Sequence, residues 1–284
     1  AELKEILASE PRIYSIIKDE LTEIKNKYAD VRRTRIIDEE KAIERAELIQ
    51  EEDIVITVTH SGYIKQVPLE TYKRQRRGGA GVIGTETKEE DFVEDLFTTS
   101  NKAQLLFFTN IGKVHWLKAY EIPQASRYSK GKAIVNLIRL QQNEKINAVL
   151  PIKEFQENTF ILLATKNGVL KKTPLIEFTN PRQGGIIAIT LRENDELVDV
   201  KLTSGNFDMI LATKNGMAVK FNEEDVRPMG RAATGVRGIT LEENDELIGI
   251  DYAPPTATLL TVTENGYGKR TNLEEYRLIS RGGK

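Results

Sequence analysis

The chain has 284 residues, a formal net charge of −2 and no cysteine, so disulfides and thiolate metal sites are excluded. No apolar run approaches the roughly 20 residues of a membrane span, and the N-terminus carries no signal-peptide pattern. We therefore expect a cytoplasmic protein without a membrane partner, cut from a longer chain because it lacks an initiator methionine.

The first part of the chain has the apolar spacing of helices. Residues 1–28 are predicted to be helical, with Pro11 near the start of a second helix, where its missing N–H costs little. Apolar residues recur there at steps of three and four, which places them on one helix face: Ile13, Ile16, Ile17, Leu21, Ile24 and Tyr28. Residues 30–35 are predicted to be a charged linker, and residues 38–50 fit either a helix or an acidic linker.

From about residue 53 the sequence changes to β-branched and aromatic runs separated by turns. Each unit repeats one order: a strand after an acidic turn, a strand before a glycine turn, a strand after it, a glycine-rich loop and a fourth strand. In one unit these strands are expected at residues 197–201, 209–213, 217–221 and 236–241. Four strands in a repeat of about 50 residues predict a mainly β, propeller-like array in which stacked blades share their cores.

Two residues recur in register with these units. A turn glycine occurs in each of five copies: Gly62, Gly112, Gly168, Gly216 and Gly266. An arginine in the glycine-rich loop follows 14 or 15 residues later: Arg77, Arg127, Arg182, Arg231 and Arg281. One cation at the same place in every unit suggests a surface that follows a regularly spaced polyanion, for which duplex DNA is the obvious candidate.

The near-neutral net charge hides a segregated distribution. Residues 60–84 and 109–139 each contain several lysines and arginines against a single glutamate, whereas acidic residues gather at 88–95, 193–196 and 243–246. Because the two kinds of cluster alternate in phase with the repeat, they predict one basic edge and one acidic edge. The alternative is that both edges are merely solvated loops.

The sequence gives little support for cofactor binding, metal binding or catalysis. A phosphate-binding G-x-x-x-x-G-K-[ST] loop is missing, so we expect no ATP and no other cofactor in this chain. His60 and His115 lack nearby partners for a metal site, and the pair Arg127-Tyr128 lies in strand and loop sequence rather than in a catalytic helix. Trp116, like Phe107 and Phe108, is expected in a core rather than as a base-stacking platform. Five lysines after the glycine turns fit DNA contact and edge solvation equally: Lys113, Lys118, Lys171, Lys172 and Lys220.

The segment Gln75-Arg76-Arg77-Gly78-Gly79-Ala80-Gly81 resembles the box that marks the C-terminal domain of the DNA gyrase A protein, Gln-Arg-Arg-Gly-Gly-Lys-Gly. The similarity continues at residues 52–55, 61–63, 227–231 and 265–271. It implies a β-pinwheel, whose blades exchange a strand, and a rim that wraps DNA so that strand passage by the ATP-driven enzyme introduces negative supercoils. It also implies two partners besides DNA, the remainder of the gyrase A protein and the gyrase B protein.

The resemblance divides the chain into a helical end of the cleavage core with its linker, residues 1–37, and a pinwheel at 38–284. It assigns sequence-independent DNA contacts to the box and the later loops, but no catalytic or metal-binding residue. The predicted contact residues are Gln75, Arg76, Arg77, Gly78, Gly79, Gly81, Arg127, Lys130, Lys132, Arg182, Arg231, Arg237, Arg281 and Lys284.

Two departures from the family pattern affect these expectations. Ala80 replaces the box lysine, which removes one candidate phosphate contact while Arg76 and Arg77 remain. The family usually has six repeats and an acidic tail, so about five blades and a missing final blade are expected here. The alternatives are the related domain of topoisomerase IV, which lacks the box in that family, and a propeller that binds proteins.

Overall fold

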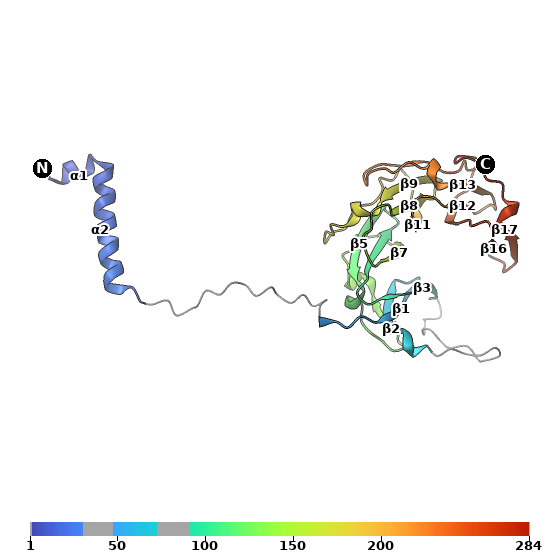
Figure 1. Ribbon diagram of the computed structural model, residues 1–284, viewed down its shortest axis with the longest axis horizontal. Helices are drawn as coiled ribbons and strands as arrows, with labels where there is room; N and C mark the ends of the chain where they lie inside the picture. The colour runs from blue at the N-terminus through green and yellow to red at the C-terminus, as the bar shows by residue number, and fades with distance from the viewer. Residues whose placement is uncertain (1, 31–47, 73–90, 284) are drawn as a thin grey trace. The chain divides into compact units, whose positions relative to one another are not determined.

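The computed structural model describes residues 2–30, 48–72 and 91–283, and the chain divides into two compact units, residues 1–48 and 49–284 (Figure 1). Each unit is considered by itself. The expected boundary between residues 37 and 38 lies outside the described residues.

The first unit consists of two helices, α1 (Glu2–Leu7) and α2 (Glu10–Tyr28), as predicted. Pro11 lies in the first turn of α2, where its lack of an N–H leaves the helical hydrogen bonds intact. The apolar stripe of α2 is exposed, including Leu21 and Ile24. Within the described part of the chain, no helix is long and apolar enough to cross a membrane.

The second unit is a series of antiparallel sheets, numbered here as blades 1 to 5. Blade 1 contains β1 (Asp53–Thr59), β2 (Tyr63–Pro68), β3 (Val93–Ser100) and β6 (Lys132–Ala133). Blade 2 contains β4 (Gln104–Thr109), β5 (Lys113–Lys118), β7 (Ile146–Ile152) and β10 (Ile186–Ile187). Blade 3 contains β8 (Phe160–Thr165), β9 (Val169–Pro174), β11 (Leu197–Thr203) and β14 (Val236–Arg237).

The last two blades have fewer strands among the described residues. Blade 4 contains β12 (Asp208–Thr213), β13 (Ala218–Asn222) and β15 (Leu247–Tyr252), and blade 5 contains β16 (Thr258–Val262) and β17 (Gly268–Asn272). Short 3₁₀ turns punctuate the array: η1 (Leu69–Thr71), η2 (Ala119–Glu121), η3 (Ile134–Asn136), η4 (Leu175–Phe178), η5 (Glu223–Asp225) and η6 (Leu273–Glu275).

Successive repeats exchange strands. The two-residue strands β6, β10 and β14 each leave the repeat in which they are encoded and pair with the preceding blade. In blade 3 the order is β11-β8-β9-β14, so both edge strands follow the central hairpin in sequence. This arrangement confirms the expected β-pinwheel and corrects the simpler assumption that the four strands of one repeat form one sheet.

The strand expected at residues 236–241 is much shorter, because β14 ends at Arg237. The amides of Gly238 and Ile239 both donate to the carbonyl oxygen of Gly168, and this ends the hydrogen-bond ladder between β14 and β9. A side chain at Gly238 would place its Cβ 2.4 Å from Cγ of Leu170, so the chain passes blade 3 too closely for anything but glycine. The β-branched composition predicted a strand, but this close approach replaces it with a crossing segment.

The core lies between blades rather than inside any one of them. In β8, Ile161 and Leu163 pack in a cluster shared with blade 2, whereas Leu162 and Ala164 pack in a cluster shared with blade 4. Successive side chains of a strand point to opposite faces, so a central strand buried on both faces is apolar at nearly every position. Each blade therefore depends on its neighbours for burial, as the repeat pattern predicted.

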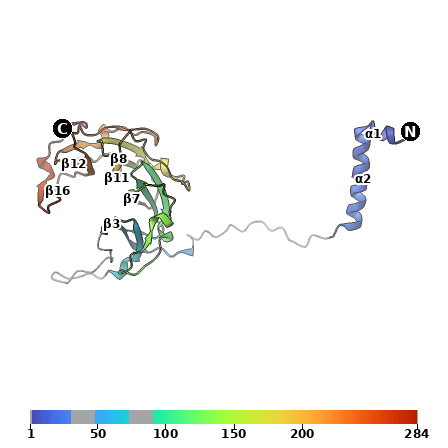
Figure 2. The same ribbon diagram turned by 180° about the vertical axis from the view of Figure 1, so that it is seen from behind.

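The two edges of each sheet have different surroundings. β11 contacts both β7 and β15, the corresponding edge strands of the blades on either side, so these strands are the inner strands of the array. Figure 2 shows β3, β7 and β11 following one another along its concave side. The exchanged strands β6, β10 and β14 occupy the opposite, outer edge of blades 1, 2 and 3.

Candidate nucleic-acid interface

The box residues Gln75, Arg76, Arg77, Gly78, Gly79 and Gly81, together with Lys284, lie outside the described residues. The other seven predicted contacts lie in or next to four segments that we call the basic loops: residues 122–131, 179–185, 226–235 and 276–283. Each basic loop begins directly after a 3₁₀ turn, and the first three lead into the outer strands. Strand exchange thus carries the first three basic loops to the outer edge.

The predicted cations differ in exposure. The side chains open to solvent are those of Lys130, Lys132, Arg182 and Arg237. The repeat arginines Arg127, Arg231 and Arg281 are half-buried. Arg281 is the most constrained, because its Nε donates to the carbonyl oxygen of Asp225 at 2.8 Å and its Nη1 to that of Arg237 at 3.1 Å. Two of its donors are therefore directed to the main chain.

Two basic loops are bonded to the segment that follows the outer strand of a neighbouring blade. The Oγ1 of Thr190, just beyond β10, donates to the carbonyl oxygen of Ala232 in the next basic loop at 2.8 Å. Thr240, just beyond β14, repeats this contact with Gly282, also at 2.8 Å. These bonds hold two of the basic loops against neighbouring parts of the array, as expected for a surface that follows a regular polymer.

Hollows open beside these loops. One of about 730 Å³ is lined by Lys113, Arg182 and Arg231, and another of about 580 Å³ by Arg139 and again Arg182. Glu177 also lines the first hollow, and its Oε2 lies 3.7 Å from Nε of Arg231. Arg182 is exposed and borders both hollows, so among the described cations it is the best placed to contact a ligand spanning two blades.

Several lysines have a role that sequence reasoning missed. Lys171, Lys172 and Lys220 were expected either to contact DNA or to solvate strand edges, and all three are buried. Burial, followed by repulsion from Arg231, lowers the pKa of Lys171 to about 8. Burial likewise lowers the pKa of Lys172. The signal was their place in the middle of strands that are covered on both faces, where even a charged residue must lie inside.

One position links consecutive blades in strands β2, β5, β9 and β13, which follow the first four turn glycines. The fourth residue after the turn glycine donates to the carbonyl oxygen at or just after the 3₁₀ turn of the following blade. These donors and acceptors are Gln66 Nε2 to Ile122 at 2.5 Å, Trp116 Nε1 to Phe178 at 3.0 Å, Lys172 Nζ to Glu223 at 2.8 Å and Lys220 Nζ to Leu273 at 3.1 Å. Trp116, Phe107 and Phe108 are core residues, as predicted.

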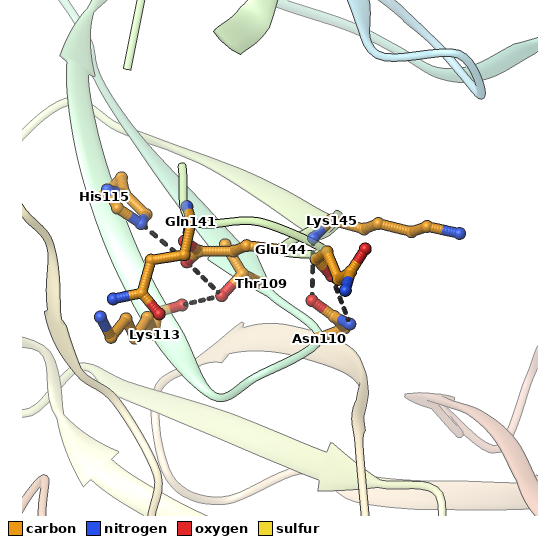
Figure 3. Close-up of polar contacts among 8 residues, drawn as sticks. Thr109, Asn110, Lys113, His115, Gln141, Glu144 and Lys145 are labelled. Carbon is orange, nitrogen blue, oxygen red and sulfur yellow. Dashed lines mark hydrogen bonds and ion pairs between the residues drawn. The ribbon is translucent and has the colours of Figure 1, made fainter. Parts of the chain in front are cut away.

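The acidic turns lead into the inner strands, and some of their carboxylates are structural. Figure 3 shows Glu144 between two segments of blade 2: its Oε1 accepts from Oγ1 of Thr109 at 3.0 Å and lies 2.9 Å from Nε2 of His115. Burial alone would raise the pKa of Glu144, but hydrogen bonds from the amide of Gln141, from His115 and from Thr109 outweigh it and lower that pKa. His115 is therefore part of a turn cap.

A related cap recurs in other blades, where Oδ2 of Asp195 accepts from Oγ1 of Thr165 at 2.7 Å as Glu144 does from Thr109. Oδ1 of Asp195 accepts from the amide of Asn167 at 2.9 Å, and Oδ1 of Asp245 accepts from that of Asn215 at 3.0 Å. These carboxylates stabilise the glycine turns, so part of the expected acidic edge is not free surface. The basic loops and the acidic turns nevertheless lead to opposite edges of the sheets, as the charge pattern predicted. No group of three or more possible metal ligands occurs within the described ranges.

The match to a known protein family divides the chain into the same repeats. The family model described as the DNA gyrase C-terminal domain, a beta-propeller, matches residues 53–100, 103–153, 159–204, 208–253 and 257–284. The DNA gyrase A protein of Clostridium acetobutylicum is 53% identical over 237 residues, which are 84% of this chain and 29% of that protein. The chain thus spans less than a third of that relative's length.

Two solved structures resemble the chain at comparable levels. The C-terminal domain of DNA topoisomerase IV superposes with a TM-score of 0.70 at 30% identity, over 83% of this chain and 72% of that one. The DNA gyrase A C-terminal domain superposes with a TM-score of 0.67 at 29% identity, over 82% of this chain and 75% of that one.

Proposed function

The chain belongs to the DNA gyrase C-terminal domain family, and from that premise we propose that it binds duplex DNA along the outer edges of its blades and bends it. The observation that carries the proposal is the placement of successive basic loops next to the outer strands, at one position per blade. A duplex crossing several blades would meet a cation at each of them. Arginine suits this role because its guanidinium binds phosphate oxygens in a bidentate manner and stays charged.

The repetition matters more than any single loop. Bending a duplex of 20–30 base pairs smoothly by 40–90° costs on the order of 1–6 kcal/mol. A single phosphate contact does not offset that cost, whereas several contacts on a rigid array do. The basic loops offer charge and main-chain amides rather than a pattern for reading base edges, so binding should be largely independent of sequence.

Within a whole enzyme, this binding would serve supercoiling. We propose that the chain is the wrapping part of a bacterial gyrase A protein and that it acts in the cytoplasm with the remainder of that protein and with the gyrase B protein. ATP binding and strand cleavage are assigned to those other parts. The relatives named as gyrase A proteins support this assignment, and the chain corresponds to 29% of the first of them.

A second candidate is the corresponding domain of topoisomerase IV, supported by the TM-score of 0.70 with that domain. The residues that favour gyrase are those of the box, Gln75 to Gly81, with Ala80 as its one departure. Both candidates predict DNA binding, and they differ in whether the DNA is held in a wrap of one hand.

The test of DNA binding is the salt dependence of affinity. If five repeat arginines each neutralise one phosphate, log affinity should fall with log salt at a slope of about −4.5, which is a loss of roughly 500-fold between 50 and 200 mM salt. Fluorescence anisotropy with a duplex of about 30 base pairs measures this slope. The matched control is Lys145→Gln, which removes an exposed cation from an acidic turn and should leave the slope unchanged. A slope near zero for the unmodified chain would contradict the proposal.

A further inference from the structure

A second buried position in strands β2, β5, β9 and β13, the strands that follow the turn glycines, faces the basic loops. Counting three residues from each turn glycine gives Lys65 in blade 1, His115 in blade 2, Lys171 in blade 3 and Val219 in blade 4. Lys65 and Lys171 are 1% and 0% exposed. Their positively charged groups are thus inside the protein, where an ammonium needs several acceptors to compensate for the lost water.

All the acceptors of Lys65, and one of the two acceptors of Lys171, are main-chain carbonyls of the following basic loop; the other acceptor of Lys171 lies just beyond β10. Nζ of Lys65 donates to the carbonyl oxygens of Arg127 at 2.5 Å, Ser129 at 2.8 Å and Ser126 at 3.3 Å. Nζ of Lys171 donates to the carbonyl oxygen of Ala188 at 2.6 Å and to that of Arg231. In both blades, one of the carbonyls bound belongs to the repeat arginine itself.

The other blades hold their loops differently. A Cβ built on Gly185 would lie 2.7 Å from Cε1 of His115, so the histidine ring packs directly against the basic loop of blade 3. Val219 in blade 4 has no donor, and in the basic loop of the following blade the guanidinium of Arg281 binds main-chain carbonyls instead. The loop at residues 276–283, which has no buried ammonium behind it, is therefore held by its own arginine, and two donors that phosphate could use are occupied.

We propose that Lys65 and Lys171 are positioning residues, which fix the backbone of Arg127 and Arg231 so that these guanidiniums are held where they can meet phosphate. The inference rests on the proposed function. Neither lysine is reachable by DNA, because both are buried, so each acts through the loop that it binds. Removing the ammonium leaves the arginine and its charge in place but releases the carbonyls that define where its side chain begins.

The chain supplies a matched control in the adjacent residue. Lys172 is also buried and also donates to a main-chain carbonyl, that of Glu223, but this acceptor lies in a 3₁₀ turn and not in a basic loop. Lys171→Met and Lys172→Met remove the same charge from the same strand. A general loss of stability or of positive charge affects both variants, whereas a loss of loop position affects only the first.

The experiment measures duplex affinity and loop protection in these variants of the full chain. At fixed salt, Lys171→Met should weaken binding by about tenfold, close to the loss of one phosphate contact, while Lys172→Met should stay near the unmodified chain. The double variant Lys171→Met/Arg231→Gln should bind no more weakly than Arg231→Gln alone. Equal losses for Lys171→Met and Lys172→Met, or additive losses in the double variant, would overturn the proposal.

Hydrogen exchange tests the positioning without DNA. Amides of residues 231–235 should exchange faster in Lys171→Met than in Lys172→Met, and unchanged exchange would overturn the proposal. If the unmodified chain fails to bind DNA while this difference appears, the proposed function fails and the loop-holding role stands. Should Lys171→Met fail to fold, Lys65→Met poses the same question for residues 126–129.

Discussion

Lys172 and Lys132 are the same residue type in neighbouring repeats, yet the first is buried in β9 and the second is exposed on β6. Nζ of Lys172 donates to a carbonyl of the next blade, whereas Lys132 follows a basic loop at the outer edge. The difference teaches that the position of a cation in the repeat, rather than its charge, decides whether it holds the blades together or faces a ligand.

The largest expected effect is on stability. Lys172→Ala leaves a cavity and removes a buried hydrogen bond to the carbonyl of Glu223, and should lower the free energy of unfolding by about 2–4 kcal/mol. Lys132→Ala should change this free energy by less than about 0.5 kcal/mol, because an exposed side chain makes few contacts in the folded state. Urea unfolding followed by the fluorescence of Trp116, the single tryptophan, measures both. Equal losses of unfolding free energy in the two variants would contradict the distinction between buried, blade-linking lysines and exposed ones.

The box offers the next largest effect, on DNA rather than on stability. Arg76→Gln/Arg77→Gln removes two predicted phosphate contacts and should weaken duplex binding by about 50-fold near 0.1 M salt. DNA bending, measured by energy transfer between the ends of a labelled duplex, should fall with it. If bending is unchanged in this variant, the box has been assigned the wrong role.

The pH dependence of stability should reveal the buried Lys171, because its ammonium can lose its proton in the accessible range while arginine stays charged. The folded pKa of Lys171, about 8, lies below its ordinary value of 10.5, so above pH 8 the unfolded chain binds more protons than the folded one. The contribution of this residue to stability should therefore increase from about pH 8 to 10.5 and then level off. Comparison of unfolding free energies for the unmodified chain and Lys171→Met isolates it. A difference that stays constant over this range would show that the pKa is not lowered.

The smallest effect should distinguish two repeat arginines. Arg182→Gln removes an exposed guanidinium and should weaken binding by about tenfold near 0.1 M salt, with a salt slope shallower by about 0.9. Arg281→Gln should weaken binding by less, because Nε and Nη1 already donate to main-chain carbonyls. Anisotropy titrations at several salt concentrations test the order, and a larger loss for Arg281→Gln would reverse it.

Much of the fold follows from the sequence because its signals are local. The spacing in α2 predicts a helix, and the glycine turns with their flanking β-branched runs predict the central hairpins. Strand exchange was less accessible, since β6, β10 and β14 have two residues each and carry no periodicity of their own. It entered only through the resemblance to a family.

The sequence located the basic loops but not the contacts that support them, and the role of the loops in binding DNA stays a prediction. The register of Arg127, Arg182 and Arg231 identified the basic loops, because one cation per repeat is visible in the sequence. The bonds from Lys171 to the loop of blade 4 and from Asn167 to Asp195 join residues that are distant along the chain. No local pattern reports such contacts, so a buried lysine and a capping aspartate were counted as surface charge.

The account's central claim is that the repeated basic loops bend DNA along one path, and ligation of nicked plasmid in the presence of this chain tests it most directly. We predict a change in linking number that grows with protein concentration and disappears with added salt. The shift should be reduced in Arg76→Gln/Arg77→Gln and retained in Lys145→Gln. An unchanged linking number, with gel retardation still showing a complex, would contradict the claim that the array imposes a handed path.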